Sequence, residues 1–219
     1  MKLVRSICTR EMMKTDVLDS SGEKIGMVGD LTFSFDGNLK LSKFILTGSR
    51  WEKFLESIKF RPDMDPVFDG SLIKTIDEHI HLDTTTNSLK TTLDSDAIPK
   101  TDIRLSDFKK MNIVDKDGKK IGRAIDIDFD VDGSVSMIVG GGFIEEKLEA
   151  FGLKADVDII VPGSVISSVG DQVYLNVSED ALKTTMEDAL KSDEVVKARR
   201  EKEVYRDVTK VRLFNQRPM

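Results

Sequence analysis

The chain has 219 residues, of which 39% are hydrophobic and 33% are charged, a balance typical of a folded protein with a heavily charged surface. No apolar run reaches the length of about 18 residues that a membrane-spanning helix needs, and charge interrupts the first eight residues before a signal-peptide core can form. The single cysteine, Cys8, excludes an intrachain disulfide framework and a cysteine-based structural zinc site. We therefore expect a cytoplasmic protein.

The net charge of −6 is unevenly distributed. Residues 197–219 hold eight basic and three acidic side chains, a net charge of +5, which leaves −11 on residues 1–196. An acidic body argues against nucleic-acid binding over the whole surface. The basic tail could contact anionic lipid, RNA, an acidic protein or the body of another copy, or it could be a solvated helix. Its only aromatic residues, Tyr205 and Phe214, give little support to an RNA-stacking surface.

An internal repeat is the strongest signal in the sequence. Residues 17–26 recur as residues 113–122 at an offset of 96, and the offset changes to 93 after three extra residues near Asn38. At the second offset Gly70-Ser71-Leu72-Ile73 matches Gly163-Ser164-Val165-Ile166. The sequence thus predicts two copies of a unit of roughly 70 residues.

Each copy is predicted to consist mainly of strands. Apolar residues alternate with polar ones, so we expect the apolar set to face the core and the polar set to face solvent. The inward sets are Leu31, Phe33 and Phe35 in the first copy and Ile125, Ile127, Phe129 and Val131 in the second. The outward sets are Asp30, Thr32, Ser34 and Asp36, and Asp126, Asp128, Asp130 and Asp132. Asp36-Gly37 and Asp132-Gly133 supply the positive φ of a tight hairpin.

A short helical stretch and a closing pair of strands complete each copy. The apolar spacing predicts helices at Trp51, Phe54, Leu55 and Ile58, and at Ile144, Lys147, Leu148 and Phe151. The fold class is therefore mainly β, with two tandem small barrels, each with a short helix, and a C-terminal α-helix. The predicted domains are residues 1–84 and 103–178, joined by a linker at 85–102 and followed by a helix and basic tail at 179–219.

The C-terminal region begins with a helix predicted over residues 179–203. Ser178 can cap it, and Leu182, Met186 and Leu190 form an apolar stripe whose first turns should dock on the second barrel. Residues 204–213 alternate loosely and could become a strand if a partner offered a sheet edge.

These motifs together resemble the PRC-barrel domain, named for the cytoplasmic part of the photosynthetic reaction-centre H subunit and also found in a ribosome-maturation protein. The resemblance rests on Val-x-Asp-x-x-Gly-x-x-Ile-Gly from Val17, on the aspartate-glycine hairpins, and on the run from Val161 to Ile166. It covers about residues 7–84 and 103–178, and is weaker in the first copy, where Asp69 replaces Pro162 and residues 61–66 differ. The resemblance implies a fold more than a function.

No combination of residues predicts catalysis, a cofactor or a metal. The aspartate strand resembles a calcium loop, but Val139 stands where a loop starting at Asp128 needs its acidic twelfth ligand. His79 and His81 should share a strand face without a third ligand. The sequence lacks a Gly-x-Ser-x-Gly elbow, and Gly140-Gly141-Gly142 fits a tight corner better than a phosphate loop.

Without catalytic residues, we expect a non-enzymatic protein–protein interaction adaptor. Some archaeal PRC-barrel proteins act in FtsZ-based cell division, where they contact the SepF-type membrane anchor of the FtsZ ring. The resemblance therefore implies a SepF-type or other division protein as partner, self-association into a dimer or polymer, no direct nucleic acid, and only indirect membrane contact. The alternatives are a ribosome or RNA maturation factor and a metal- or ligand-binding module. The residues chosen for partner binding are Arg199, Arg200, Arg212 and Phe214.

Overall fold

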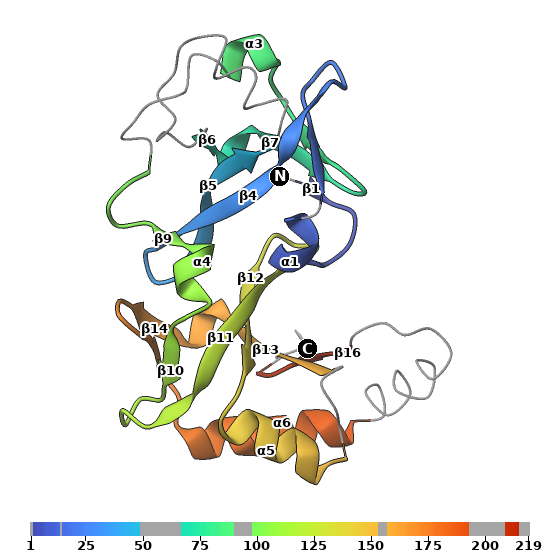
Figure 1. The fold of residues 1–219 in the computed structure, drawn as a ribbon. Helices are drawn as coiled ribbons and strands as arrows, with labels where there is room; N and C mark the ends of the chain where they lie inside the picture. The colour runs from blue at the N-terminus through green and yellow to red at the C-terminus, as the bar shows by residue number, and fades with distance from the viewer. Residues whose placement is uncertain are drawn as a thin grey trace. The chain divides into compact units, whose positions relative to one another are not determined.

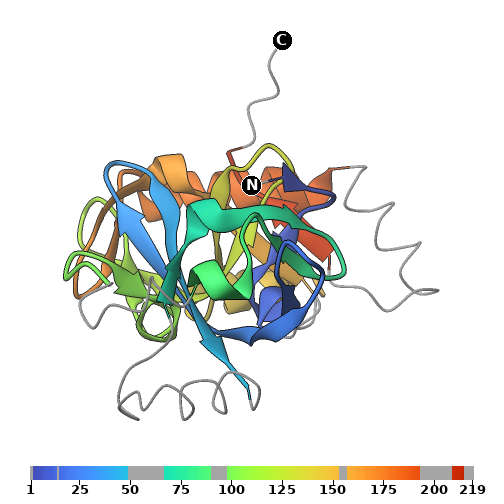
Figure 2. The ribbon, with the colours of Figure 1, turned by 90° about the horizontal axis from the view of Figure 1, so that it is seen from above.

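The computed structural model describes residues 2–13, 15–48, 67–89, 98–152, 157–192 and 209–214. It is mainly β, with two sheets that can be followed by colour in Figure 1 and from above in Figure 2. The chain divides into two compact units: residues 1–108 with 128–134, and residues 109–127 with 135–219. The tip of one hairpin, 128–134, therefore belongs to a different unit from its stem.

The first unit is built on a sheet with the strand order β1-β7-β8-β3-β4-β5-β6. Its strands are β1 (Lys2–Leu3), β2 (Ile7–Cys8), β3 (Asp16–Leu18), β4 (Lys24–Phe35), β5 (Leu39–Thr47), β6 (Val67–Asp69), β7 (Ile73–Ile76), β8 (Ile80–Leu82) and β9 (Ile103–Arg104). Its helical segments are α1 (Thr9–Met12), the 3-10 turn η1 (Gly70–Leu72), α3 (Thr86–Leu89) and α4 (Leu105–Phe108). Gly22 and Gly37 supply the positive φ of the two turns that flank β4.

Aromatic side chains fill the core of the first unit. Phe33 on β4 stacks against Phe129, with ring centroids 6.2 Å apart, and Phe44 on β5 stacks on Phe68 of β6 at 5.6 Å. All four rings are buried, as is Phe108 at the end of α4. Burying each ring stabilises the unit by about 1.5–3 kcal/mol.

The second unit is built on a sheet with the strand order β14-β15-β10-β11-β12-β13-β16. Its strands are β10 (Asn112–Val114), β11 (Lys120–Phe129), β12 (Val135–Gly140), β13 (Val157–Pro162), β14 (Ile166–Val169), β15 (Val173–Leu175) and β16 (Thr209–Arg212). Its helical segments are α5 (Phe143–Ala150), the 3-10 turn η2 (Gly163–Val165) and α6 (Glu179–Lys191). Branched aliphatic side chains fill its core: Ile113, Ile121, Ile127, Ile138 and Ile159 are all fully buried.

The two sheets share one internal strand order. The run β7-β8-β3-β4-β5-β6 in the first sheet corresponds to β14-β15-β10-β11-β12-β13 in the second, including the parallel pairing of β3 with β8 and of β10 with β15. The sheets differ in what is added: β1 extends the first at β7, whereas β16 extends the second at β13, the opposite end of the shared order.

A buried aspartate fixes the turn before the long strand in each unit. Asp19 accepts hydrogen bonds from the backbone N–H groups of Ser21 (2.9 Å), Glu23 (3.0 Å) and Thr86 (3.0 Å). Burial raises the pKa of Asp19, but these bonds and those from the Ser21 and Thr86 hydroxyls outweigh it and hold the pKa well below its ordinary value. We call this group of residues the first corner.

The second corner has the same geometry around Asp115. Its carboxylate accepts the backbone N–H groups of Asp117 (3.0 Å), Lys119 (2.8 Å) and Glu179 (2.9 Å). Burial again raises the pKa of Asp115, and the three backbone bonds more than offset this, so the pKa lies below its ordinary value. In both corners the carboxylate thus ties a turn to the start of a helix, α3 or α6.

The absence of a side chain at Gly122 allows the backbone of Gly140 and Gly141 to pass closely beside β11. A Cβ at Gly122 would stand 2.5 Å from the carbonyl oxygen of Gly140 and 3.0 Å from that of Gly141. Gly141 and Gly142 have positive φ and lead into α5. Gly140, Gly141 and Gly142 therefore form the strand-to-helix corner that the sequence predicted.

The prediction that the aspartates of this strand face solvent is wrong for two of the four, Asp126 and Asp128. Asp126 and Asp128 are buried, with Asp128 0% exposed, whereas Ile125 and Val131, predicted to face inward, are 37% and 56% exposed. The prediction fails because both faces of β11 are buried near its end, where Ile127, Asp128 and Phe129 are each 0% exposed. Along its edge, Asp128 and Phe129 pair with Cys8 and Ile7 of β2. Alternation identifies the buried face only when the other face is open to water.

Other members of these alternating sets are as predicted: Leu31, Phe33, Ile127 and Phe129 are buried, and Asp36 and Asp132 are exposed. Two members of the first copy differ. Thr32 is buried rather than outward; it donates to Asp102 (2.9 Å) and accepts from the Lys43 backbone N–H (3.1 Å). Phe35, expected in the core, is only half-buried. The helix expected at Trp51, Phe54, Leu55 and Ile58 lies outside the described residues.

The predicted domain boundaries do not coincide with the compact units. Residues 103–108, assigned to the second domain, lie in the first unit, where Ile103 and Arg104 of β9 pair with β4. Much of the predicted linker, residues 90–97, lies outside the described residues. The boundaries at 84, 102 and 178 remain a prediction.

Candidate interaction surface at the C-terminal strand

The C-terminal strand β16 pairs in parallel with β13. The register joins Val157 to Thr209 and Ile160 to Arg212, and the Leu213 backbone N–H donates to the Ile160 carbonyl oxygen at 2.9 Å. β16 ends the strand order of its sheet, so among the described strands it forms the edge. An edge of this kind is a place where further backbone can pair.

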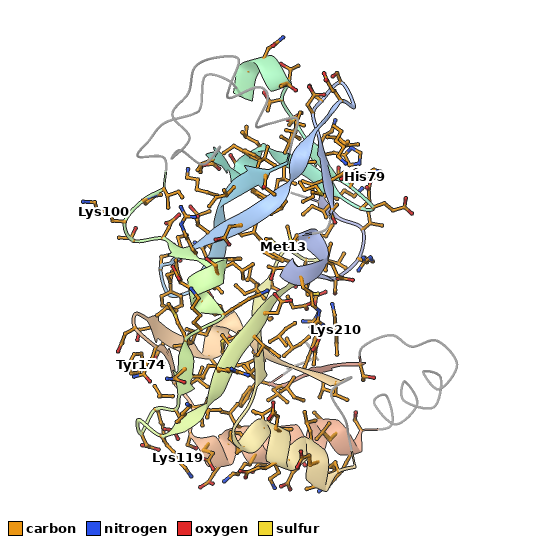
Figure 3. The ribbon with its side chains drawn as sticks, in the orientation of Figure 1. Met13, His79, Lys100, Lys119, Tyr174 and Lys210 are labelled. Atoms are coloured by element: carbon orange, nitrogen blue, oxygen red, sulfur yellow. The ribbon has the colours of Figure 1, made fainter. Side chains whose placement is uncertain are left out.

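The side chains of this segment alternate between core and surface. Thr209, Val211 and Leu213 are buried, whereas Lys210 and Arg212 are half-buried (Figure 3 labels Lys210). Lys210 is the register partner of Asp158, a buried carboxylate on β13, so the two opposite charges lie on neighbouring strands. The segment is thus held by backbone pairing with β13 and by the burial of Thr209, Val211 and Leu213.

The sequence predicted a strand here only if a partner offered an edge. The structure corrects that condition, because β13 of the same chain supplies the edge. The continuous apolar run Ile159-Ile160-Val161 on β13 was the available signal, since a strand buried on both faces lies inside a sheet more often than at its edge.

Of the four residues predicted to bind a partner, the structure describes two, Arg212 and Phe214. Arg212 ends β16, and Phe214 follows two residues later, half-buried and with a φ of 55°. A bulky residue in the left-handed region marks a sharp turn of the chain directly after the strand. Arg199 and Arg200 lie outside the described residues.

Helix α6 precedes this segment and is fixed at its start. The Ser178 hydroxyl accepts the Ala181 N–H at 3.3 Å, which confirms the predicted cap. Glu179 is buried between Lys119, at 2.6 Å, and Lys183; the hydrogen bond from Lys119 and then that from Lys183 hold the pKa of Glu179 below its ordinary value (Lys119 is labelled in Figure 3).

One face of α6 is buried and another is joined to α5. Leu182, Met186 and Leu190 are buried, as the apolar stripe predicted. Glu187 bonds to Lys147 of α5, and Lys183 lies 5.7 Å from the centroid of the Phe143 ring. Lys147, predicted to belong to the apolar stripe of α5, is therefore an ion-pair residue. The described helix ends at Lys191, and the predicted continuation to 203 lies outside the described residues.

The other candidate groups form separate local contacts. His79 lies in the turn before β8 and His81 on β8, with ring centroids 6.2 Å apart (His79 is labelled in Figure 3). His81 bonds to Asp77 at 3.1 Å, and the pKa of Asp77 is lowered first by the hydrogen bond from the His79 backbone and then by that from His81. The two rings lie close together, but His79 stands in the turn rather than on the strand that the spacing predicted, and Asp77 is the acidic neighbour that the spacing did not reveal.

Cys8 and the aspartates of the strand that resembled a calcium loop make contacts with neighbouring side chains. Cys8 is buried, and its thiol lies 3.4 Å from the Glu11 carboxylate. Asp126 pairs with Lys109 at 3.2 Å, and Asp130 accepts the Ser6 hydroxyl at 2.8 Å. In the described ranges no three His, Cys, Asp or Glu side chains lie together as metal ligands would.

Comparison with known families assigns part of the chain. Residues 100–182 match the PRC-barrel domain. The match includes β9 to β15 and the start of α6, and thus the second corner and the glycines beside β11. No curated protein matches the chain by sequence. None of the helices described has both the length and the apolar character required to cross a membrane.

Proposed function

We propose that this protein is a non-enzymatic adaptor made of two PRC-type barrels that arose by internal duplication. The PRC-barrel match supports the second barrel. The first is supported by its strand order and by the two corners, where Asp19 with Thr86 and Asp115 with Glu179 make equivalent backbone bonds. Matching of contacts between residues far apart in sequence favours duplication over chance similarity of short turns.

The observation that carries the adaptor role is the addition of β16 to the edge of β13. A sheet that accepts an extended segment through backbone pairing, with pockets for alternate side chains, uses the same physical mode as many peptide-recognition domains. The half-buried Arg212 and Phe214 next to this edge add a guanidinium group and an aromatic ring, and arginine and aromatic residues are enriched where proteins bind one another.

The proposed setting is FtsZ-based cell division in an archaeon, with a SepF-type anchor as the partner. The support for this setting is the resemblance to archaeal PRC-barrel proteins together with a sequence that lacks a recognisable catalytic motif. In this proposal the protein self-associates as a dimer or polymer at the division site and reaches the membrane only through the anchor.

Binding of the full chain to a purified SepF-type protein tests the proposal by biolayer interferometry. We expect saturable binding that weakens at least about tenfold in the variant Arg199→Glu/Arg200→Glu/Phe214→Ala, because partner contacts of Arg and aromatic residues dominate many interfaces. The charge-matched control Lys116→Glu/Lys120→Glu changes exposed residues of the β10–β11 region and should bind as the wild type does.

Recovery of ribosomal particles by the full chain, without binding to the SepF-type protein, would overturn the division role and support ribosome maturation instead. Equal weakening by the two charge-matched variants would show that net charge alone drives the association, and would remove the tail from the proposed surface.

A further inference from the structure

The attachment of β16 to its unit is narrow. Within the described residues it pairs with one strand, β13, and its buried side chains are Thr209 and Val211, followed by Leu213 directly after the strand. A strand of this length with a single neighbouring strand is not stable alone, and its position depends on the edge that receives it.

The covalent connection between α6 and β16 is long. Residues 193–208 join the two elements, and 16 residues can reach at most about 55 Å. The β13 edge of a neighbouring molecule is therefore within chain reach at high concentration. Nothing in the chemistry of the edge distinguishes the segment of its own chain from the identical segment of another copy.

Charge favours the encounter of two copies through this segment. Residues 197–219 carry +5 and the remainder of the chain −11, so the tail of one molecule is attracted to the body of any other. At the edge itself, the register partner of Lys210 is the buried Asp158. The same opposite charges would meet in an intermolecular pairing.

We propose that β16 is exchanged between copies of this protein, with Thr209–Leu213 of one molecule seated on the β13 edge of another. Reciprocal exchange closes a dimer, whereas one-way exchange leaves a free segment and a free edge at the two ends and produces an open chain of molecules. The tether favours the pairing within one molecule by its effective concentration, so exchange increases with total protein concentration. This proposal specifies the contact behind the self-association in the proposed function and rests on it.

Cysteine cross-linking in the full chain distinguishes exchange from pairing within one molecule. Val157 and Thr209 are register partners, and adjacent strands bring Cα atoms to about 5 Å, within the range for a disulfide. One chain would carry Cys8→Ser with Val157→Cys, and a second chain Cys8→Ser with Thr209→Cys. Neither chain can form the 157–209 disulfide alone, so oxidised glutathione links them only after exchange.

Two controls accompany this mixture. A chain with both Val157→Cys and Thr209→Cys on the Cys8→Ser background reports, by an intramolecular disulfide, that the substituted strands still pair. A mixture of Thr209→Cys with Lys116→Cys places the second thiol in the β10–β11 turn, separated from β16 by other strands of the sheet, and should not cross-link.

We expect a disulfide-linked heterodimer from the 157/209 mixture whose fraction rises with total protein concentration, and at least about tenfold less from the 116/209 mixture. Light scattering on the wild type separates the two proposals. An oligomer whose 157/209 mixture stays unlinked, although the double-cysteine chain closes, overturns strand exchange alone. A wild type that is monomeric at every concentration, with no cross-link, overturns self-association and exchange together.

Discussion

The first and second corners solve one structural problem with different surroundings. In each, a buried aspartate binds the N–H groups of its own turn and of a distant helix start, and the backbone bonds around it also correspond: the Ser20 N–H donates to Thr84 at 2.9 Å, and the Lys116 N–H to Val177 at 3.1 Å. The first residue of the distant helix, whose N–H group the aspartate binds, is Thr86 in the first corner and Glu179 in the second.

This difference changes how the helix start is stabilised. The Thr86 hydroxyl adds a bond to the Asp19 carboxylate at 2.8 Å, whereas Glu179 brings a second negative charge, which Lys119 and Lys183 neutralise. The comparison teaches that the backbone pattern is the shared requirement, since it is kept where the side chains differ. We therefore consider first the substitutions at positions that correspond in the two units, and last the charge that only the second corner holds.

The largest loss of stability is expected at Gly122, where two stretches of backbone lie close together. Gly122→Ala would place a Cβ 2.5 Å from the Gly140 carbonyl oxygen, so β11 or the glycine corner must shift, at a cost of about 3 kcal/mol. Gly26→Ala, the matching change in the first unit, meets one carbonyl oxygen at 2.9 Å and should cost less. Chemical denaturation measures both free energies of unfolding.

Gly170→Ala is the control for these two changes, because a Cβ there meets nothing within 4 Å and its φ is not in the left-handed region. An equal loss of stability in Gly122→Ala and Gly170→Ala would contradict the close approach beside β11.

The next largest effect comes from the aspartates themselves. Asp115→Ala leaves the N–H groups of Asp117, Lys119 and Glu179 without their acceptor and should lower the free energy of unfolding by about 2–3 kcal/mol. Asp19→Ala should cost a similar amount in the first unit. Exposed Asp117→Ala, in the same turn, serves as the control in thermal and chemical denaturation. A loss for Asp115→Ala no greater than for Asp117→Ala would show that the corner contributes no stability.

Much of the fold was predictable from local sequence, whereas these corners were not. Gly22 and Gly118 marked turns because a positive φ favours glycine, and Ser178 marked a helix start through its hydroxyl. Asp19 and Thr86, however, are 67 positions apart, so no local pattern joins them. Asp126 and Asp128 were assigned to solvent because local alternation does not show that both faces of β11 are buried, and the strand that pairs with Asp128 comes from residues 7–8.

The candidate surface was predictable only in part. The basic composition of the tail singled out Arg212, and the alternation of residues 204–213 indicated a potential strand. The edge that receives it belongs to β13, about 50 residues earlier, and pairing at that separation depends on the complete sheet rather than on either segment.

Acid should weaken both corners. The pKa values of Asp19, Asp115 and Glu179 lie below their ordinary values in the folded protein. Carboxylates of this kind contribute stability above their unfolded pKa, near 4, and lose it as the pH falls through the folded value. We expect the free energy of unfolding to fall as the pH is lowered from about 5 towards 3, with a contribution from each corner.

Asp19→Asn and Asp115→Asn test the origin of this acid sensitivity, because an amide does not titrate. Each variant should be less stable than the wild type at neutral pH and show a flatter pH dependence in denaturation curves. A slope unchanged in both variants would assign the acid sensitivity to other carboxylates.

The smallest effect concerns the charge found only in the second corner. Lys119→Met removes one of the two cations at Glu179 but leaves Lys183, so the loss should be about 0.5 kcal/mol, as for a solvent-exposed ion pair. Lys119→Met combined with Lys183→Met leaves the buried Glu179 carboxylate without either lysine, and the loss should exceed the sum of the two single losses. Strictly additive losses at Lys119 and Lys183 would contradict this coupling, because they would mean that each lysine acts on the Glu179 charge independently of the other.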